Sequence, residues 1–324
     1  MSAARRIPLI TLVLVAPLVA AACGDSPKPV ATTTTVAAGA STPATSTPSV
    51  ATTAPVVVTF ADGDSAYRAG QYAEAAKLFT EYGERHPDNA GAYYMVGLSS
   101  WKAGDLRTAD SAFSRALALD PRHVKALLNS SRVLIDLGRF DDALDRINSA
   151  LEIDSTSSTA RRLQARVLER QGDIDGAIDA YQDALVADET DVWAMNNLGL
   201  IYIQQGRAEE ALPPLARAVE LRSTSPVFQN NLGTALEQTH HFADAADAYA
   251  AALAADSSYA KAAVSLARVR DRVDTAGTGP VSLPQLAQAF TLQIRMVKDS
   301  RTIVQPDSAV SAAGDTAKVN EPQR

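Results

Sequence analysis

A repeat of 34 residues constrains this chain more than any other feature of its sequence. One column of the repeat holds alanine in every unit: Ala75, Ala109, Ala143, Ala177, Ala211 and Ala245. A second column holds glycine in five units, at Gly70, Gly104, Gly138, Gly172 and Gly206, and histidine in the sixth, at His240. A fixed period of this length indicates a supersecondary unit that is repeated along the chain.

Each repeat contains two helical patterns. In residues 90–123 the first pattern runs to about Lys102, Gly104 interrupts it, and the second runs over 107–119, before Pro121. A small residue, Gly97, falls where the two helices would touch. Such a hairpin cannot bury its apolar surface alone, so neighbouring hairpins must stack on it. Six units follow one another without insertion: 56–89, 90–123, 124–157, 158–191, 192–225 and 226–259.

These units resemble the tetratricopeptide repeat. The family's pattern of large, small, glycine, tyrosine, alanine, aromatic and proline positions is matched in 90–123, and again by LGLIY at 198–202 with Ala211 and Ala218. The resemblance implies an all-α fold, namely a right-handed alpha solenoid of six helical hairpins with a C-terminal capping helix.

Several positions depart from the family pattern. The closing proline occurs only at Pro87 and Pro121. His240 must adopt whatever backbone conformation the equivalent glycines adopt. Pro213 and Pro214 remove two backbone donors from a predicted second helix, so we expect a local bend there.

The N-terminus has the features of an export signal. Residues 1–22 contain Arg5 and Arg6, then an apolar run shorter than a membrane-spanning helix, then small residues. We expect a signal peptide that is cleaved before Cys23. One interpretation resembles a bacterial lipoprotein signal, in which Cys23 is diacylated and anchors the protein to a membrane. The alternative is an ordinary A-x-A cleavage site at 20–22, which would release the protein.

We favour lipidation, because Cys23 is the only cysteine and lies where lipidation would use it. The residues that follow, up to residue 55, are mostly Thr, Ser, Pro, Ala and Val, so 23–55 is predicted to be the lipidated cysteine and a disordered linker. The predicted location is the extracytoplasmic side of the cell envelope. If two membranes are present, Gly24 after the cysteine favours the outer one.

The repeat pattern ends with an unpaired first helix. Residues 260–273 continue that pattern and are predicted to cap the solenoid, which would then span 56–273. Within 274–324 we expect a linker, an amphipathic helix at about 284–297 and a disordered tail. That helix either folds back on the solenoid, which we favour, or docks on a partner.

The sequence contains no motif that indicates catalysis. It has no G-x-G-x-x-G, P-loop, H-E-x-x-H or G-x-S-x-G motif, and one cysteine cannot build a thiolate zinc site. We therefore expect a protein that is not an enzyme, with no cofactor and no metal. The net charge of −7 repels phosphate, so we also expect no nucleic-acid partner.

The family resemblance implies where a partner would bind. In such solenoids the first helices line a concave groove, and the residues expected to point into it include Tyr94, Trp101, Asn129, Arg132, Arg162, Arg166, Arg170, Trp193, Asn197 and Asn231. Asparagine can both donate to and accept from a peptide backbone, and arginine can bind carboxylates. The groove would then hold an extended acidic or C-terminal segment. The alternative is that the arginines form only a solvated helix face.

The predicted function is a non-catalytic scaffold for protein–protein interaction in the bacterial cell envelope. The alternative is an accessory subunit of an envelope enzyme or assembly machine, such as a pilus, an outer-membrane insertion complex, a wall hydrolase or a glycosyltransferase. The sequence leaves open which partner is bound and what the oligomeric state is.

Overall fold

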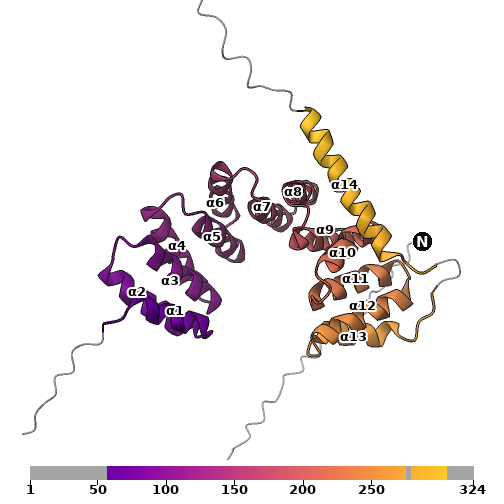
Figure 1. Cartoon of the computed structure of the whole chain (residues 1–324), viewed down its shortest axis with the longest axis horizontal. Helices are drawn as coiled ribbons and strands as arrows, with labels where there is room; N and C mark the ends of the chain where they lie inside the picture. Colours follow the sequence, from indigo (N-terminus) through magenta and orange to yellow (C-terminus); the bar gives the residue numbers. More distant parts are fainter. Residues whose placement is uncertain (1–56, 275–278, 305–324) are drawn as a thin grey trace, which may run out of the picture. The chain divides into compact units, whose positions relative to one another are not determined.

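The computed structural model describes residues 57–274 and 279–304. Within these residues every regular element is an α-helix, and there are fourteen (Figure 1). They are α1 (Phe60–Arg68), α2 (Tyr72–Arg85), α3 (Ala90–Lys102), α4 (Leu106–Leu119), α5 (Val124–Asp136), α6 (Phe140–Ile153), α7 (Ser158–Gln171), α8 (Ile174–Ala187), α9 (Val192–Gln204), α10 (Ala208–Leu221), α11 (Pro226–Gln238), α12 (Phe242–Ala255), α13 (Ala260–Val269) and α14 (Leu283–Val304). The predicted all-α helical repeat fold is confirmed.

The helices α1 to α12 form the six predicted hairpins. Each odd-numbered helix is the first helix of a unit and packs against the even-numbered helix that follows it. Each hairpin also packs against the next one, so that the units form a continuous stack. The predicted signal peptide, Cys23 and the whole of the linker lie outside the described residues.

The turn inside each hairpin depends on one residue with positive φ. Five of these residues are glycines, with φ between +70° and +87°. In the sixth unit His240 takes the same conformation, with φ 64°, and is the only non-glycine residue with positive φ in the described part of the chain. The expectation that His240 adopts the glycine conformation is therefore confirmed. An L side chain there costs free energy, because its Cβ crowds the backbone.

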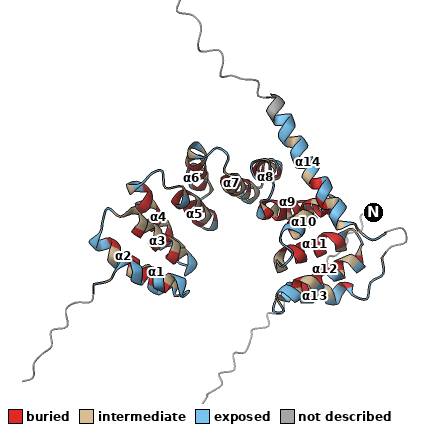
Figure 2. Ribbon diagram, in the orientation of Figure 1, coloured by how far each residue is buried: buried red, intermediate tan, exposed pale blue. Residues whose placement is uncertain are grey.

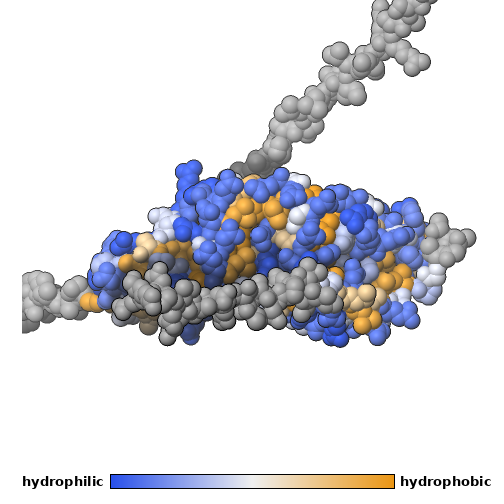
Figure 3. Space-filling view, turned by 90° about the horizontal axis from the view of Figure 1, so that it is seen from above, coloured by the Kyte–Doolittle hydropathy of each residue, from blue (hydrophilic) through white to orange (hydrophobic). Residues whose placement is uncertain are grey.

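The regular spacing of small residues has a steric cause. A Cβ added to Gly97 would lie 2.7 Å from the ring of Phe113, and one added to Gly199 would lie 2.5 Å from Cγ of Leu215. The alanine of the second helix is fully buried in all six units, including Ala143. Buried residues gather between the packed helices, where small side chains allow the helix backbones to approach (Figure 2). The face drawn in Figure 3 is largely hydrophilic and carries apolar bands.

The C-terminal helices differ in length from the prediction. The capping helix α13 ends at Val269, whereas the sequence pattern suggested an end near Val273. The last helix, α14, continues to Val304 instead of ending near Val297, and the rest of the predicted tail lies outside the described residues. No proline or glycine interrupts 298–304, and the next breaker is Pro306.

Helix α14 folds back on the solenoid, as the favoured alternative predicted. It packs on α8 and α10, two second helices, with Phe290 and Ile294 buried. Helix α10 runs without interruption through Pro213 and Pro214. Among the helices described, none combines the length and apolar character needed to cross a membrane.

Candidate functional site

The predicted binding residues all lie on the first helices α3, α5, α7, α9 and α11. We call the residues at these positions the first-helix surface: Tyr94, Trp101, Asn129, Arg132, Arg162, Arg166, Arg170, Trp193, Asn197 and Asn231. The structure connects several of them to one another through hydrogen bonds. It also shows that the arginines differ in how far their charge is already paired.

Tyr94, Asn129 and Arg132 form one connected group. Nη1 of Arg132 donates to Oδ1 of Asn129 over 2.5 Å, and Nδ2 of Asn129 donates to the Tyr94 hydroxyl over 3.1 Å. The Tyr94 ring stacks on His123, with centroids 4.8 Å apart. This stack and the hydrogen bond hold the Tyr94 side chain of α3 against α5 and its N-cap residue.

The Arg132 guanidinium is half-buried and has no carboxylate partner among the described residues. Burial lowers its pKa, and the positive charges of Arg162 and Arg166 lower it further. Three guanidinium groups from α5 and α7 therefore lie close enough to repel one another. An anionic group placed between them would relieve that repulsion.

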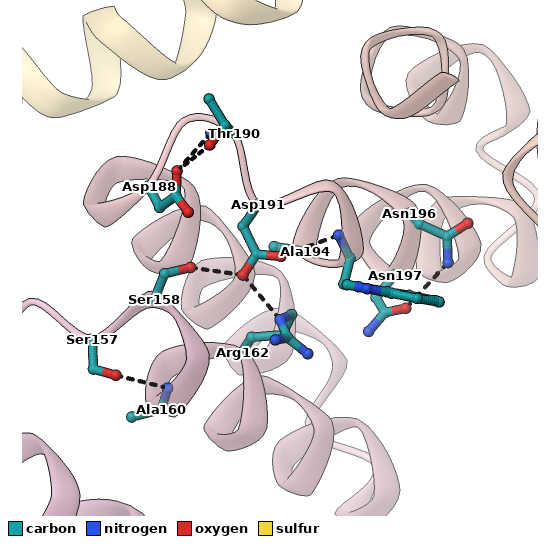
Figure 4. Close-up of polar contacts among 11 residues, drawn as sticks. Ser157, Ser158, Ala160, Arg162, Asp188, Thr190, Asp191, Ala194, Asn196 and Asn197 are labelled. Atoms are coloured by element: carbon teal, nitrogen blue, oxygen red, sulfur yellow. Dashed lines mark hydrogen bonds and ion pairs between the residues drawn. The ribbon is translucent and has the colours of Figure 1, made fainter. Parts of the chain in front are cut away.

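Arg162 is engaged in a structural ion pair (Figure 4). Its Nε donates to Oδ2 of Asp191 over 2.9 Å, and only 15% of the Arg162 side chain and 8% of the Asp191 side chain are exposed. Asp191 also accepts from the Ser158 hydroxyl and, as the N-cap of α9, from the backbone of Trp193 and Ala194. Burial alone would raise the Asp191 pKa, but Arg162 and the hydrogen bonds outweigh it, and the pKa is lowered.

Arg166 and Arg170 lie beside a small cavity. Arg166 is 3.8 Å from Asp136, a long ion pair, and Arg170 lies over the ring of Phe140 at 5.9 Å. The cavity has a volume of about 250 Å³ and is lined by Arg166, Glu169, Arg170, Asn197 and Leu200. It could hold one side chain of a bound segment.

One of the residues that line this cavity, Glu169, is half-buried. The hydroxyl of Tyr181 donates to Oε2 of Glu169 over 3.3 Å. Burial raises the Glu169 pKa, while Tyr181, Arg166 and Arg170 oppose the rise. Burial, and next the Glu169 charge, raise the Tyr181 pKa. Tyr181 therefore remains a protonated donor at neutral pH.

The asparagines of α9 and α11 form a hydrogen-bonded row. Nδ2 of Asn230 donates to Asn231 over 3.4 Å, Nδ2 of Asn231 donates to Asn196 over 2.8 Å, and Nδ2 of Asn196 donates to Asn197 over 3.2 Å. Asn231 is 8% exposed and uses both ends of its amide within the row. Each end of the Asn231 amide therefore already has one partner within the row, and the hypothesis that Asn231 binds a peptide backbone stays a prediction.

The two tryptophans occupy different environments. Trp101 is half-buried against a hydrophobic cluster whose buried residues come from α4, α5, α6 and α7, with the Lys102 amine 5.4 Å from its ring. Trp193 is 43% exposed and meets Phe228 edge-on at 5.0 Å. Trp193 is therefore the large apolar side chain that this surface presents to solvent.

Sequence reasoning missed the carboxylates on this surface. Asp191, Asp136 and Glu169 each contact or neighbour one of the predicted arginines. The sequence did indicate that Asp191 is unusual. It is the only acidic residue at the N-cap position of the first helices, where other units hold Asn89, His123, Ser157 and Ser225. In the described part of the chain, no group of three or more His, Cys, Asp or Glu side chains could hold a metal ion.

Comparison with protein families identifies the repeat. A model described as tetratricopeptide repeat matches residues 100–167, and another of the same description matches residues 60–109 and 162–226. Together they span residues 60–226, just over half of the chain. The chain is a tetratricopeptide repeat protein. Repeats of this family generally mediate protein–protein interaction and are typically non-catalytic.

Two solved structures share the fold, and a third is similar over a shorter part of the chain. One from Parabacteroides merdae has 16% identity and a TM-score of 0.56, over 65% of this chain and 83% of that one. The APC/C hetero-tetramer Cut9–Hcn1 has 18% identity and a TM-score of 0.55, over 65% of this chain and 42% of that one. A protein from Thermus thermophilus has 20% identity and a TM-score of 0.49, over 56% of this chain and 98% of that one. No curated protein matches this tetratricopeptide repeat protein in sequence.

Proposed function

We propose that this tetratricopeptide repeat protein is a non-catalytic scaffold whose first-helix surface holds an extended, acidic segment of a partner protein. The observation that carries the proposal is the unpaired charge of Arg132. Its guanidinium is half-buried, hydrogen-bonds to Asn129, and lies near two further arginines. Arginine binds carboxylates through two parallel hydrogen bonds, so an Asp, a Glu or a terminal carboxylate would complete this group.

The arginines of the first-helix surface have different proposed roles. Arg162 is committed to Asp191 and positions α7 against α9, so its role is structural. Arg132 and Arg166 are the proposed carboxylate ligands, because one lacks a carboxylate partner among the described residues and the other has only a long contact to Asp136. The cavity next to Arg166 and the exposed ring of Trp193 would receive neighbouring side chains of the same segment.

We also propose that the scaffold works in the cell envelope, held to a membrane by a lipid on Cys23. This rests on the sequence of residues 1–23, with its two arginines, its short apolar run and its single cysteine. Metabolic labelling with a radioactive fatty acid tests the anchor. We expect label in the wild-type protein and none in Cys23→Ser.

The binding proposal is tested with arrays of short peptides that do or do not carry Asp, Glu or a free C-terminus. We expect acidic peptides to bind, and Arg132→Gln/Arg166→Gln to lose at least about tenfold in affinity, since charge-assisted hydrogen bonds contribute about 1.5–3 kcal/mol each. Arg107→Gln/Arg122→Gln is the matched control, because it removes the same charge from exposed positions outside this surface.

Equal losses in both double variants would show that only net charge matters and would contradict the proposal. Circular dichroism of each variant confirms that the helices are intact.

A further inference from the structure

The fourth and sixth repeats carry the same pair of polar residues between their two helices. Glu169 of α7 and Glu237 of α11 occupy one position of the repeat, and Tyr181 of α8 and Tyr249 of α12 occupy another. In both repeats the tyrosine hydroxyl donates to the carboxylate, over 3.3 Å in the fourth and 2.9 Å in the sixth. The other four repeats have no acidic residue at the first position and no tyrosine at the second. The surroundings of the two carboxylates can therefore be compared directly.

In the sixth repeat an arginine from the next first helix binds the carboxylate. Nε and Nη2 of Arg268, on α13, donate to the two carboxylate oxygens of Glu237 over 2.7 Å each. Only 14% of the Glu237 side chain is exposed. The hydrogen bonds from Arg268 outweigh the effect of this burial, and the Glu237 pKa is lowered. A cation from the neighbouring repeat thus completes this carboxylate.

In the fourth repeat the equivalent place is a cavity. Leu200 of α9 stands at the position of Arg268, and the cavity of about 250 Å³ is lined by Leu200 and Glu169 among others. In the described part of the chain, the Tyr181 hydroxyl is the one hydrogen-bond donor to the Glu169 carboxylate, which forms no ion pair. The Glu169 pKa is raised by burial, whereas the Glu237 pKa is lowered. Glu169 therefore lacks the cation that Glu237 has.

The two arginines beside the cavity contact the preceding repeat instead of Glu169. Arg166 lies 3.8 Å from Asp136 of α5, and Arg170 lies over the ring of Phe140 of α6. Their charges lower the Glu169 pKa without cancelling the rise that burial causes. A further cation in the cavity would be repelled by both arginines, so it must form direct hydrogen bonds to Glu169 to be held there.

We propose that this cavity is a subsite for an arginine of the bound segment, whose guanidinium donates two hydrogen bonds to Glu169 as Arg268 does to Glu237. The planar guanidinium matches both carboxylate oxygens, whereas a lysine ammonium offers a single point of charge. The inference rests on the proposed function, because it assigns a second residue of the same segment. The acidic residue that pairs with Arg132 and Arg166 would offset the positive charge beside the cavity. The recognised segment then carries an acidic residue and an arginine close together.

A substitution in the chain itself tests whether the cavity accepts a guanidinium. Leu200→Arg introduces the residue that α13 carries at the same position, and Leu200 is half-buried, so we expect the fold to be preserved. The Glu169 pKa, measured by NMR of the carboxyl carbons, should fall in Leu200→Arg. It should stay raised in Leu200→Gln, which adds a polar side chain without charge. An unchanged Glu169 pKa in Leu200→Arg overturns the proposal.

Peptides test the subsite in the wild-type chain. The probes are glycine–serine peptides that carry one Asp and one Arg, with zero to three residues between them. At one spacing we expect the arginine peptide to bind at least about tenfold more tightly than the same peptide with citrulline, which has a similar shape but no charge. The two peptides should bind Glu169→Gln equally. Glu152→Gln is the matched control, because it removes an exposed carboxylate on α6, and it should retain the difference.

Replacing Asp by Asn in these peptides separates the subsite from the proposed function. Equal binding of the arginine and citrulline peptides, with Asp still preferred to Asn, overturns the subsite alone. A preference for arginine that persists in Glu169→Gln also overturns it, because another group would then bind the guanidinium. A preference for arginine that depends on Glu169, without any preference for Asp, supports the subsite and contradicts the proposed acidic segment.

Discussion

Nε of Arg162 donates a 2.9 Å hydrogen bond to Oδ2 of Asp191, and this buried pair joins α7 to the first turn of α9. The carboxylate also caps α9 and accepts from Ser158. Removing it would leave the Arg162 charge buried without a partner, so we expect Asp191→Ala to lower the free energy of unfolding by about 3–5 kcal/mol. Chemical denaturation measures this change. Glu210→Ala, which breaks the exposed pair with Arg207, serves as the control and should cost less than about 1 kcal/mol.

The Asp191 carboxylate should make the free energy of unfolding depend on pH. Its pKa is lower in the folded protein than in the unfolded chain, where it is about 3.9. The stabilisation is therefore complete above about pH 4 and is lost as the pH falls through the lower, folded value. We expect the stability difference between the wild type and Asp191→Asn to shrink below about pH 4. A difference that stays constant across an acid titration would show that Asp191 acts by shape alone.

The positive φ of the turn residues predicts opposite effects for two substitutions. At Gly206, φ is +70° and an added Cβ would meet nothing within 4 Å, so Gly206→Ala should cost about 1 kcal/mol through the backbone alone. His240 already bears that cost, and His240→Gly should raise stability by about 0.5–1 kcal/mol. Thermal unfolding of both variants measures the pair, and a destabilised His240→Gly would mean that the histidine ring contributes more than its strain.

Two helical glycines distinguish steric fit from helix propensity. A Cβ on Gly199 would lie 2.5 Å from Leu215, so Gly199→Ala should overpack the hairpin and cost about 1–3 kcal/mol. The nearest atom to a Cβ on Gly83 is 3.6 Å away, an ordinary contact, and Gly83→Ala should stabilise α2 by about 0.5–1 kcal/mol. Equal effects of the two substitutions in denaturant titrations would contradict the close approach of α9 and α10.

The hairpins could be predicted because close packing of the helices restricts which residues can occupy the contact positions. Gly97 must be small because the ring of Phe113 fills its space, and the same steric demand recurs at Gly199 and Gly233. The positions of the predicted binding residues on the first helices follow from this register.

The polar partners of those residues could not be predicted in the same way. Asn196 meets Asn231 across 35 residues, and Arg162 meets Asp191 across 29, so each contact depends on how one unit sits on the next. The placement of α14 did leave a signal, because Pro213 stands where other units carry exposed polar residues. That proline had suggested a bend in α10 rather than a contact.

The amide donors of Asn230, Asn231 and Asn196 follow one another in one direction along the row, which ends at Asn197 beside the cavity that Arg166 lines. Turning one amide over would set two N–H groups, or two oxygens, against each other at its neighbour. The row can therefore reverse only if all four amides rotate together. A ligand that turned the amide of Asn197 over would therefore also turn the amide of Asn230, one repeat away, without any movement of a helix.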